Sequence, residues 1–344
     1  MSTRIWSVVV VAVTTLALRS CLPVDAQAPA PAQAPAPAKP AAPAAAPPTP
    51  APKATVVYPK PFASAEEAVQ AFVAALRAGD TKALMGILGS EGRPLIQSGD
   101  SVVDRQSREE FLAAYDTANR LAAGGDTTVI HVGTDEWAFP IPLVKVGERW
   151  RFDPRQGREE IFARRIGRNE LNTMQTCLSY VDAQREYYAE DRDGDGLLEY
   201  APQFGSTRGK RDGLYWVTKP GEPPSPLGDL IVRARAEGYR REMPGPTPFH
   251  GYLYRILTAQ GPSAPGGEYD YVVRGQMIAG FALVAFPAQY GVSGVMTFIV
   301  NHDGIVYEKD LGPGTRATGL AMRKFNPDGT WAKTEVPEVA AAKP

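Results

Sequence analysis

QGREEIFARRIGRNELNTMQTCLSYVDAQREYYAE, residues 156–190, is the stretch that decides the fold. Apolar residues recur in it at spacings of three, four and seven positions, at Leu171, Met174, Leu178, Val181 and Tyr188. This spacing places them on one face of a helix. The stretch therefore predicts a long amphipathic helix, and Gly167 is a position where it is expected to kink or divide.

The chain beyond this helix predicts a shorter helix and then a sheet. A helix is expected over residues 226–237. Runs rich in β-branched and aromatic residues then predict strands over 250–258, 280–286, 295–301 and 305–309. His302-Asp303-Gly304 separates the last two runs and has the composition of a hairpin turn.

The chain before the long helix begins with helical patterns. Ser64, with Glu67 three positions later, forms a capping box and predicts a helix that ends at Gly79. Ser107 and Glu110 form a second capping box and predict another helix start. Gly124-Gly125-Asp126 is expected to end that second helix.

Strand patterns follow these helices. They predict strands over residues 127–132, 136–146 and 149–153. Helices followed by an antiparallel meander, a long helix and a second set of strands predict the α+β fold class.

The N-terminal residues have the features of an export signal. Arg4 precedes a short apolar run over residues 5–18, and Val24-Asp25-Ala26 fits the small-x-small rule, so we expect cleavage before Gln27. The alternative is a lipoprotein, because Leu18-Arg19-Ser20-Cys21 resembles a lipobox with Cys21 as the lipidated residue. Arg19 departs from that pattern. A stretch that is nearly all Pro and Ala follows, which predicts an extended tether.

Several blocks of the chain occur in the order found in a known family of exported bacterial proteins. They are Trp150–Asp153, Arg164–Leu171, Phe249–Tyr252, Gly280–Pro287 and Tyr290-Gly291. From about Phe62 to Lys333 the chain resembles the family called domain of unknown function 2950. The resemblance implies an envelope protein and no established activity or catalytic residues.

Two weaker resemblances concern the fold. The first half is similar to the nuclear-transport-factor-like cone folds, and the second half is similar to the globular part of pilins and pseudopilins. The helix start at residues 159–170 is rich in Arg and Glu, unlike the apolar segment through which pilins polymerise. We thus expect a signal peptide (1–26), a disordered Pro/Ala-rich spacer (27–60), a cone-like domain (61–155), a pilin-like domain (156–335) and a disordered tail (336–344).

The acidic loop after the long helix is the clearest chemical signal. Asp191, Asp193 and Asp195 alternate before Gly196, as in the first half of a calcium loop, and Glu199 falls where such a loop often holds a water-mediated ligand. Position twelve is Pro202, so this is not a complete EF-hand. We predict a structural calcium site here. The alternative is an acidic turn that ends a helix.

Three other groups of residues have a structural and a functional interpretation. Tyr115, His131 and Trp137 are candidates for a pocket in the cone-like domain, although core or rim positions are favoured. His250, Tyr252 and Tyr254 alternate with Arg255 opposite, which is typical of a packed sheet face. Cys177 lies beside Met174 on the apolar side of the helix and is expected to be a buried, inert thiol.

Composition and motifs exclude several functions. The net charge of −1 gives no reason to expect a nucleic-acid partner. The three histidines are far apart in sequence, and the chain has no Gly-x-Ser-x-Gly elbow, phosphate loop or dinucleotide fingerprint. We therefore expect no catalytic residues and no cofactor other than calcium.

The function expected from the sequence is non-catalytic. We expect a periplasmic or cell-envelope protein that acts as a binding, scaffold or assembly factor for an envelope protein or a small ligand. It would contact the membrane only through a lipid anchor. The alternatives are a hydrolase or ligand-processing enzyme that uses the cone-like domain's pocket, and an accessory of a pilus or secretion machine.

Overall fold

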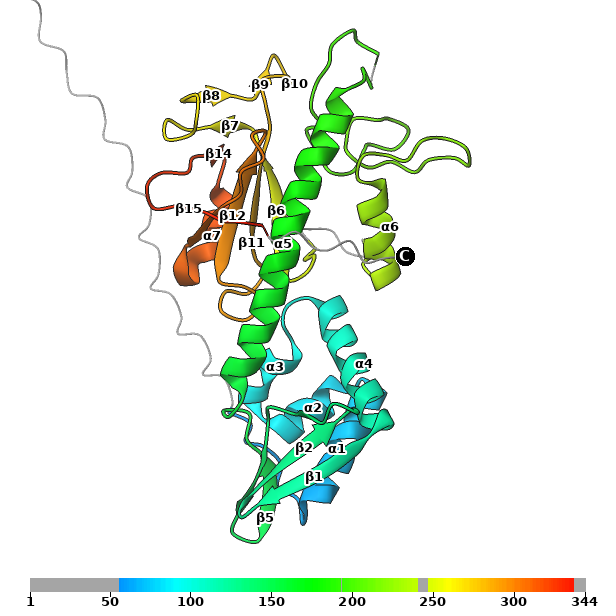
Figure 1. Ribbon diagram of the computed structural model, residues 1–344, viewed down its shortest axis with the longest axis vertical. Helices are drawn as coiled ribbons and strands as arrows, with labels where there is room; N and C mark the ends of the chain where they lie inside the picture. Colours follow the sequence, from blue (N-terminus) through cyan, green and yellow to red (C-terminus); the bar gives the residue numbers. More distant parts are fainter. Residues whose placement is uncertain (1–55, 193, 241–246, 337–344) are drawn as a thin grey trace, which may run out of the picture. The chain divides into compact units, whose positions relative to one another are not determined.

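The computed structural model describes residues 56–192, 194–240 and 247–336 (Figure 1). Helices and antiparallel sheets alternate along these residues, which confirms the α+β class. The signal peptide, Cys21, most of the spacer and most of the predicted tail lie outside the described residues. Among the described helices, none is long and apolar enough to cross a membrane.

The first helix follows the capping box predicted for it. The Ser64 hydroxyl accepts a hydrogen bond from the Glu67 N–H at 3.1 Å, and Glu67 accepts one from the Ala63 N–H at 2.8 Å. Helix α1 (Ala65–Ala78) then ends at Gly79, whose φ of 62° is left-handed. Three short helical segments follow: α2 (Thr81–Leu88), η1 (Ser90–Gly92) and α3 (Arg93–Ile96).

Helix α4 (Ser101–Thr117) begins earlier than predicted, so the start at Ser107 is wrong. Asp100 is the N-cap, and its carboxylate accepts hydrogen bonds from the N–H groups of Val102 (3.0 Å) and Val103 (3.3 Å). This capping satisfies two N–H groups that the helix cannot satisfy itself, which fixes the start at Ser101. Ser107 lies in the helix interior.

The first sheet is antiparallel, with the strand order β1-β2-β4-β5 and β3 paired to β2. Its strands are β1 (Asn119–Gly124), β2 (Thr127–Val132), β3 (Trp137–Ala138), β4 (Leu143–Val146) and β5 (Arg149–Phe152). The run predicted over 136–146 is two strands, since Pro140 and Pro142 interrupt it. The glycines at 124–125 do not end a helix, because they connect β1 to β2.

Helix α5 (Arg158–Tyr188) is the predicted long helix, and it continues through Gly167. Its buried face differs from the predicted apolar stripe. Leu171 is 46% exposed, whereas Arg165, Asn169 and Thr173 are buried. Buried polar residues form the first half of this face, so the apolar spacing alone could not identify it.

Helix α6 (Gly228–Glu237) agrees with its prediction, and an antiparallel sheet with the order β15-β13-β12-β11-β6 follows. Its strands are β6 (Tyr252–Leu257), β11 (Ala282–Pro287), β12 (Met296–Asn301), β13 (Tyr307–Asp310) and β15 (Ala332–Lys333). The predicted turn at His302-Asp303-Gly304 joins β12 to β13. Two short helices follow β13 in the chain: η2 (Gly312–Gly314) and α7 (Thr315–Ala321).

Helices cover both faces of this sheet. Tyr254 of β6 reaches the Thr173 hydroxyl on α5, with 3.3 Å between the oxygens. The next residue, Arg255, donates to the Gly319 and Leu320 carbonyls on α7. Because successive side chains of a strand point to opposite faces, α5 and α7 lie on opposite sides. Smaller strands complete the structure: β7 (Ala259–Gln260), β8 (Tyr269–Asp270), β9 (Val272–Val273), β10 (Gln276–Met277) and β14 (Lys324–Phe325).

Two hydrophobic cores stabilise the described residues. The first lies among the N-terminal helices and sheet, and Phe62, Phe72 and Phe152 are buried in it. The second lies between α5 and the sheet β15-β13-β12-β11-β6. Arg165 on α5 connects the two parts, because its guanidinium donates to the carbonyls of Pro94 (2.7 Å) and Leu95 (2.6 Å).

Candidate functional site

A large cleft lies in the second half of the chain. Its volume is about 1250 Å³, and it is lined by α5, the segment 203–222, α6, residues 247–249 and β6. Small-molecule sites typically have volumes of about 300–1000 Å³. The cleft can therefore accommodate an entire small ligand.

Backbone hydrogen bonds hold the 203–222 segment in place. The Tyr215 N–H donates to the Phe204 carbonyl at 2.8 Å, and the Ser206 N–H donates to the Tyr215 carbonyl at 2.8 Å. The Tyr187 hydroxyl on α5 donates to the Arg211 carbonyl at 2.7 Å. Gly213 is required at this crossing, since a Cβ there would lie 2.8 Å from the Gly205 backbone. The segment is thus fixed against α5.

One wall of the cleft is apolar. It is lined by Leu227, which directly precedes α6, and by Leu230, Ile231 and Ala234, which lie on one face of α6. Leu283, buried in β11, and several aromatic residues complete it: Tyr180, Phe204, Tyr215, Trp216, Phe249 and Tyr254.

The other lining residues include six cations. They are Arg208, Lys210, Arg211, Lys219, Arg235 and Arg240. Two of the guanidiniums stack on aromatic rings: Arg235 lies 5.2 Å from the Tyr215 ring centre, and Arg211 lies 5.5 Å from that of Trp216. Such contacts fix the direction of an otherwise mobile charge.

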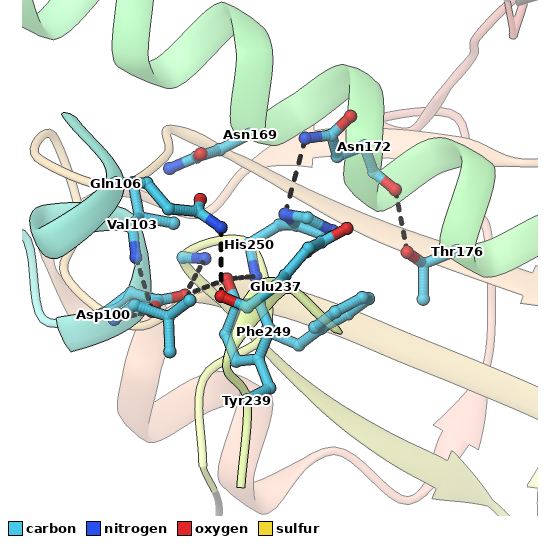
Figure 2. Close-up of polar contacts among 12 residues, drawn as sticks. Asp100, Val103, Gln106, Asn169, Asn172, Thr176, Glu237, Tyr239, Phe249 and His250 are labelled. Carbon is cyan, nitrogen blue, oxygen red and sulfur yellow. Dashed lines mark hydrogen bonds and ion pairs between the residues drawn. The ribbon is translucent and has the colours of Figure 1, made fainter. Parts of the chain in front are cut away.

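A cluster of buried polar residues holds in place the residues at one end of the cleft (Figure 2). Asp100 is 2% exposed, and its second carboxylate oxygen accepts hydrogen bonds from the Tyr239 hydroxyl (3.0 Å) and the Gly251 N–H (2.9 Å). The Tyr239 hydroxyl also accepts from the His250 N–H at 3.1 Å. The N-cap of α4 therefore holds Tyr239, which lines the cleft, and the chain beside Phe249.

His250 is the strained residue of this cluster. Its φ of 50° is left-handed, which costs energy for a residue other than glycine. Its Nε2 lies 3.6 Å from a Glu237 carboxylate oxygen, and its Nδ1 lies 3.5 Å from Asn172 Nδ2 (Figure 2). Burial lowers the pKa of His250, and the charges of Glu237 and Asp100 oppose that shift. Its side chain packs on the Phe249 ring, with 4.1 Å between ring centres.

In the acidic loop, carboxylates accept hydrogen bonds from backbone N–H groups. Asp191 accepts hydrogen bonds from the N–H groups of Gly194 (2.7 Å) and Gly196 (2.9 Å), and Asp195 accepts one from that of Leu197 (2.8 Å). Asp195 also accepts from the Gln276 amide. Asp193 lies outside the described residues, and the described ones, Glu199 included, contain no group of three side chains placed to hold a metal. Calcium binding stays a prediction.

The residues predicted for a pocket in the first half are not brought together. Trp137 pairs with the buried Val132 and shares its face, whereas His131 lies on the other face of β2. His131 Nδ1 lies 3.0 Å from the Glu136 carbonyl oxygen, within a turn. Tyr115 packs against the first hydrophobic core, 6.1 Å from Phe111 between ring centres.

The predicted stripe on β6 is a packed face, with one correction. Tyr252 is buried, and its hydroxyl donates to the Met296 carbonyl at 2.9 Å. His250 precedes the strand, because its left-handed φ cannot belong to an extended strand. Cys177 is fully buried, and burial raises the pKa of its thiol to about 12, as expected for an inert thiol.

Sequence reasoning missed the cleft. Its cations come from an irregular segment and from the exposed side of a short helix, where no periodicity marks them. One signal was available: Arg208-Gly-Lys-Arg211 lies four residues before Tyr215-Trp216. A basic run beside two aromatic residues is typical of an anion-binding loop.

The fold and the cleft define an α+β protein with a ligand-sized, positively charged cleft. The chain belongs to the family described as "Protein of unknown function (DUF2950)", which it matches over residues 59–334. Neither the curated proteins nor the solved structures include a significant match to it.

Proposed function

We propose that this protein is an exported cell-envelope protein that binds a small ligand in the cleft without chemical change. The size of the cleft carries the proposal, since about 1250 Å³ lined by aromatic and cationic side chains suits a ligand. The polar groups offered to that ligand are mostly cations and hydroxyls, with one carboxylate, Glu222, and such groups bind and orient a ligand. The export features of residues 1–27 support a location outside the cytoplasm.

The alternative proposal is an enzyme that uses a pocket in the first half of the chain. The placement of His131 and Trp137 on opposite faces of one sheet favours binding over this alternative. Phe62, Phe72 and Phe152 fill the space between the N-terminal helices and that sheet. Attachment to a pilus or secretion machine is a weaker proposal, which rests on the resemblance to pilins alone.

The test uses native mass spectrometry after incubation with a small-molecule extract of bacterial envelopes. We expect a retained species on the wild-type protein and its loss from Leu230→Trp, because Leu230 lines the cleft. Val232→Trp is the matched control, since Val232 lies on the same helix and is 64% exposed. Retention by both variants, or no retained species on the wild type, would contradict the proposal.

A further inference from the structure

The charge of the cleft differs sharply from that of the whole chain. Six cations and one carboxylate, Glu222, line it, which gives a formal charge of +5, whereas the chain carries −1. Glu222 lies 3.9 Å from Arg211, and its carboxylate also accepts a hydrogen bond from the Lys219 N–H at 3.2 Å. Like charges held close together repel one another, so an anion in the cleft would be stabilised.

Three of these cations have no competing ion pair or ring contact among the described residues. Among the described residues, the side chains of Arg208, Lys210 and Lys219 have no ion-pair partner, and all three are exposed. They lie within the segment that the Tyr187 hydroxyl of α5 holds through the Arg211 carbonyl. An anionic group can therefore bind them without breaking an existing ion pair.

Most of the cations and the aliphatic lining come from different parts of the chain. Four of the six cations, Arg208, Lys210, Arg211 and Lys219, belong to the 203–222 segment, while Leu230, Ile231 and Leu283 belong to the wall formed by α6 and β11. Arg235 lies on α6 itself and stacks on the Tyr215 ring. A compact anion would leave that apolar wall in contact with water. A plain hydrocarbon would leave the cations without a partner. Only a molecule with both parts satisfies both surfaces.

We infer that the cleft binds an anionic amphiphile, with the anionic head group on the cations of the 203–222 segment and the apolar chain along α6. This inference rests on the proposed binding function and names the class of ligand. Charge complementarity selects the head group, and the spacing of apolar residues on α6 selects the chain.

The first arm of the test is a series of n-alkyl phosphates, from butyl to decyl, below their micelle concentrations. Trp216 lines the cleft, so its fluorescence is the readout, with Trp216→Phe to confirm the source of the signal. Each added methylene that reaches the apolar wall should lower Kd about fourfold. The 1-alkanol and the alkyltrimethylammonium of equal length should bind far more weakly.

The second arm uses charge variants. Arg208→Glu with Lys210→Glu should weaken decyl phosphate at least about tenfold and remove most of the salt dependence of Kd. Lys145→Glu with Arg149→Glu is the matched control, because both residues are exposed on the first sheet and do not line the cleft. Equal binding by the two double variants would overturn the inference.

The outcomes separate this inference from the proposed function. Inorganic phosphate binding as tightly as decyl phosphate would show a compact-anion site, and equal binding of decanol would show an apolar one. Either result overturns the amphiphile while the binding function stands. Absence of binding across the series also overturns it, and the extract experiment with Leu230→Trp then decides the binding function separately.

Discussion

His250 combines a left-handed backbone with a half-buried ring, and both features have consequences. The φ of 50° is maintained because the Tyr239 hydroxyl and Asp100 hold the N–H groups of residues 250 and 251. Burial lowers the pKa of the ring below its ordinary value. The unfolded chain therefore binds a proton more readily than the folded chain as the pH falls.

The pH dependence of stability should follow from this difference. The contribution of His250 is fully present above the unfolded pKa of about 6.5 and is lost as the pH falls toward the folded pKa. We expect the urea midpoint of the wild type to fall more between pH 7 and pH 5 than that of His250→Asn. Asparagine tolerates the left-handed φ and does not titrate.

The comparison of the wild type with His250→Asn separates the effect of His250 titration on stability from that of other titrating groups. Burial raises the pKa of Asp104, whose effect on stability has the opposite sign, but Asp104 is present in both proteins. At pH 8, above the unfolded pKa of histidine, the urea midpoints of the two proteins should differ only by the pH-independent effect of the substitution. Parallel midpoint curves from pH 8 to pH 5 would refute the prediction.

At the scale of the element, the sequence predicted those helices whose ends are set by capping residues next to them in the chain. Helix α1 has its own capping box and a glycine at its end, and α6 ends at Gly238 with a φ of 104°. The start of α4 was missed because Ser107 and Glu110 also fit a capping box, whereas the cap is Asp100, whose carboxylate accepts hydrogen bonds from the Val102 and Val103 N–H groups. Strand β1, with the sequence NRLAAG, has weak strand propensity and forms by pairing with β2.

The candidate site was harder to predict than the elements. The cleft joins residues from Thr176 to Leu283, and no spacing in the sequence links them. Its end wall depends on Asp100, which no local pattern connects to Phe249 or Tyr239. Such a site depends on tertiary contacts, so the sequence showed only its most local part, the basic run before Tyr215 and Trp216.

The loop after α5 is the element for which metal binding is predicted. Millimolar calcium should raise the melting temperature by about 3 °C when it is about ten times Kd, and a chelator should reverse the change. The expected cause is neutralisation of the carboxylates at 191, 193 and 195. Asp195→Asn should reduce the response, while Asp126→Asn, in the β1–β2 turn, should not. Equal melting temperatures with calcium and with chelator would count against the site.

At the scale of the whole molecule, buried polar groups connect the two hydrophobic cores, alongside the apolar contacts of Ile161 and Phe162 of α5 with the first core. Arg165 donates to carbonyls of α3, and Asp100 accepts from Tyr239 and Gly251. Buried charges are costly unless they are fully hydrogen-bonded, which makes these contacts specific in geometry. The cleft in the second half therefore depends on correct folding of the first half.

Export is the remaining prediction for the whole molecule, and intact mass tests it. Protein recovered from the envelope of an expressing bacterium should lack residues 1–26 and begin at Gln27, because Val24-Asp25-Ala26 fits the signal-peptidase rule. Ala26→Arg should block that cleavage and leave a heavier product, whereas Cys21→Ser should leave the mature mass unchanged. A mature protein that begins at Cys21 with a diacylglyceryl addition would instead establish the lipoprotein, since the Cys21 thiol is the group such a lipid modifies. The cleft would then act at a membrane surface, where anionic amphiphiles are concentrated.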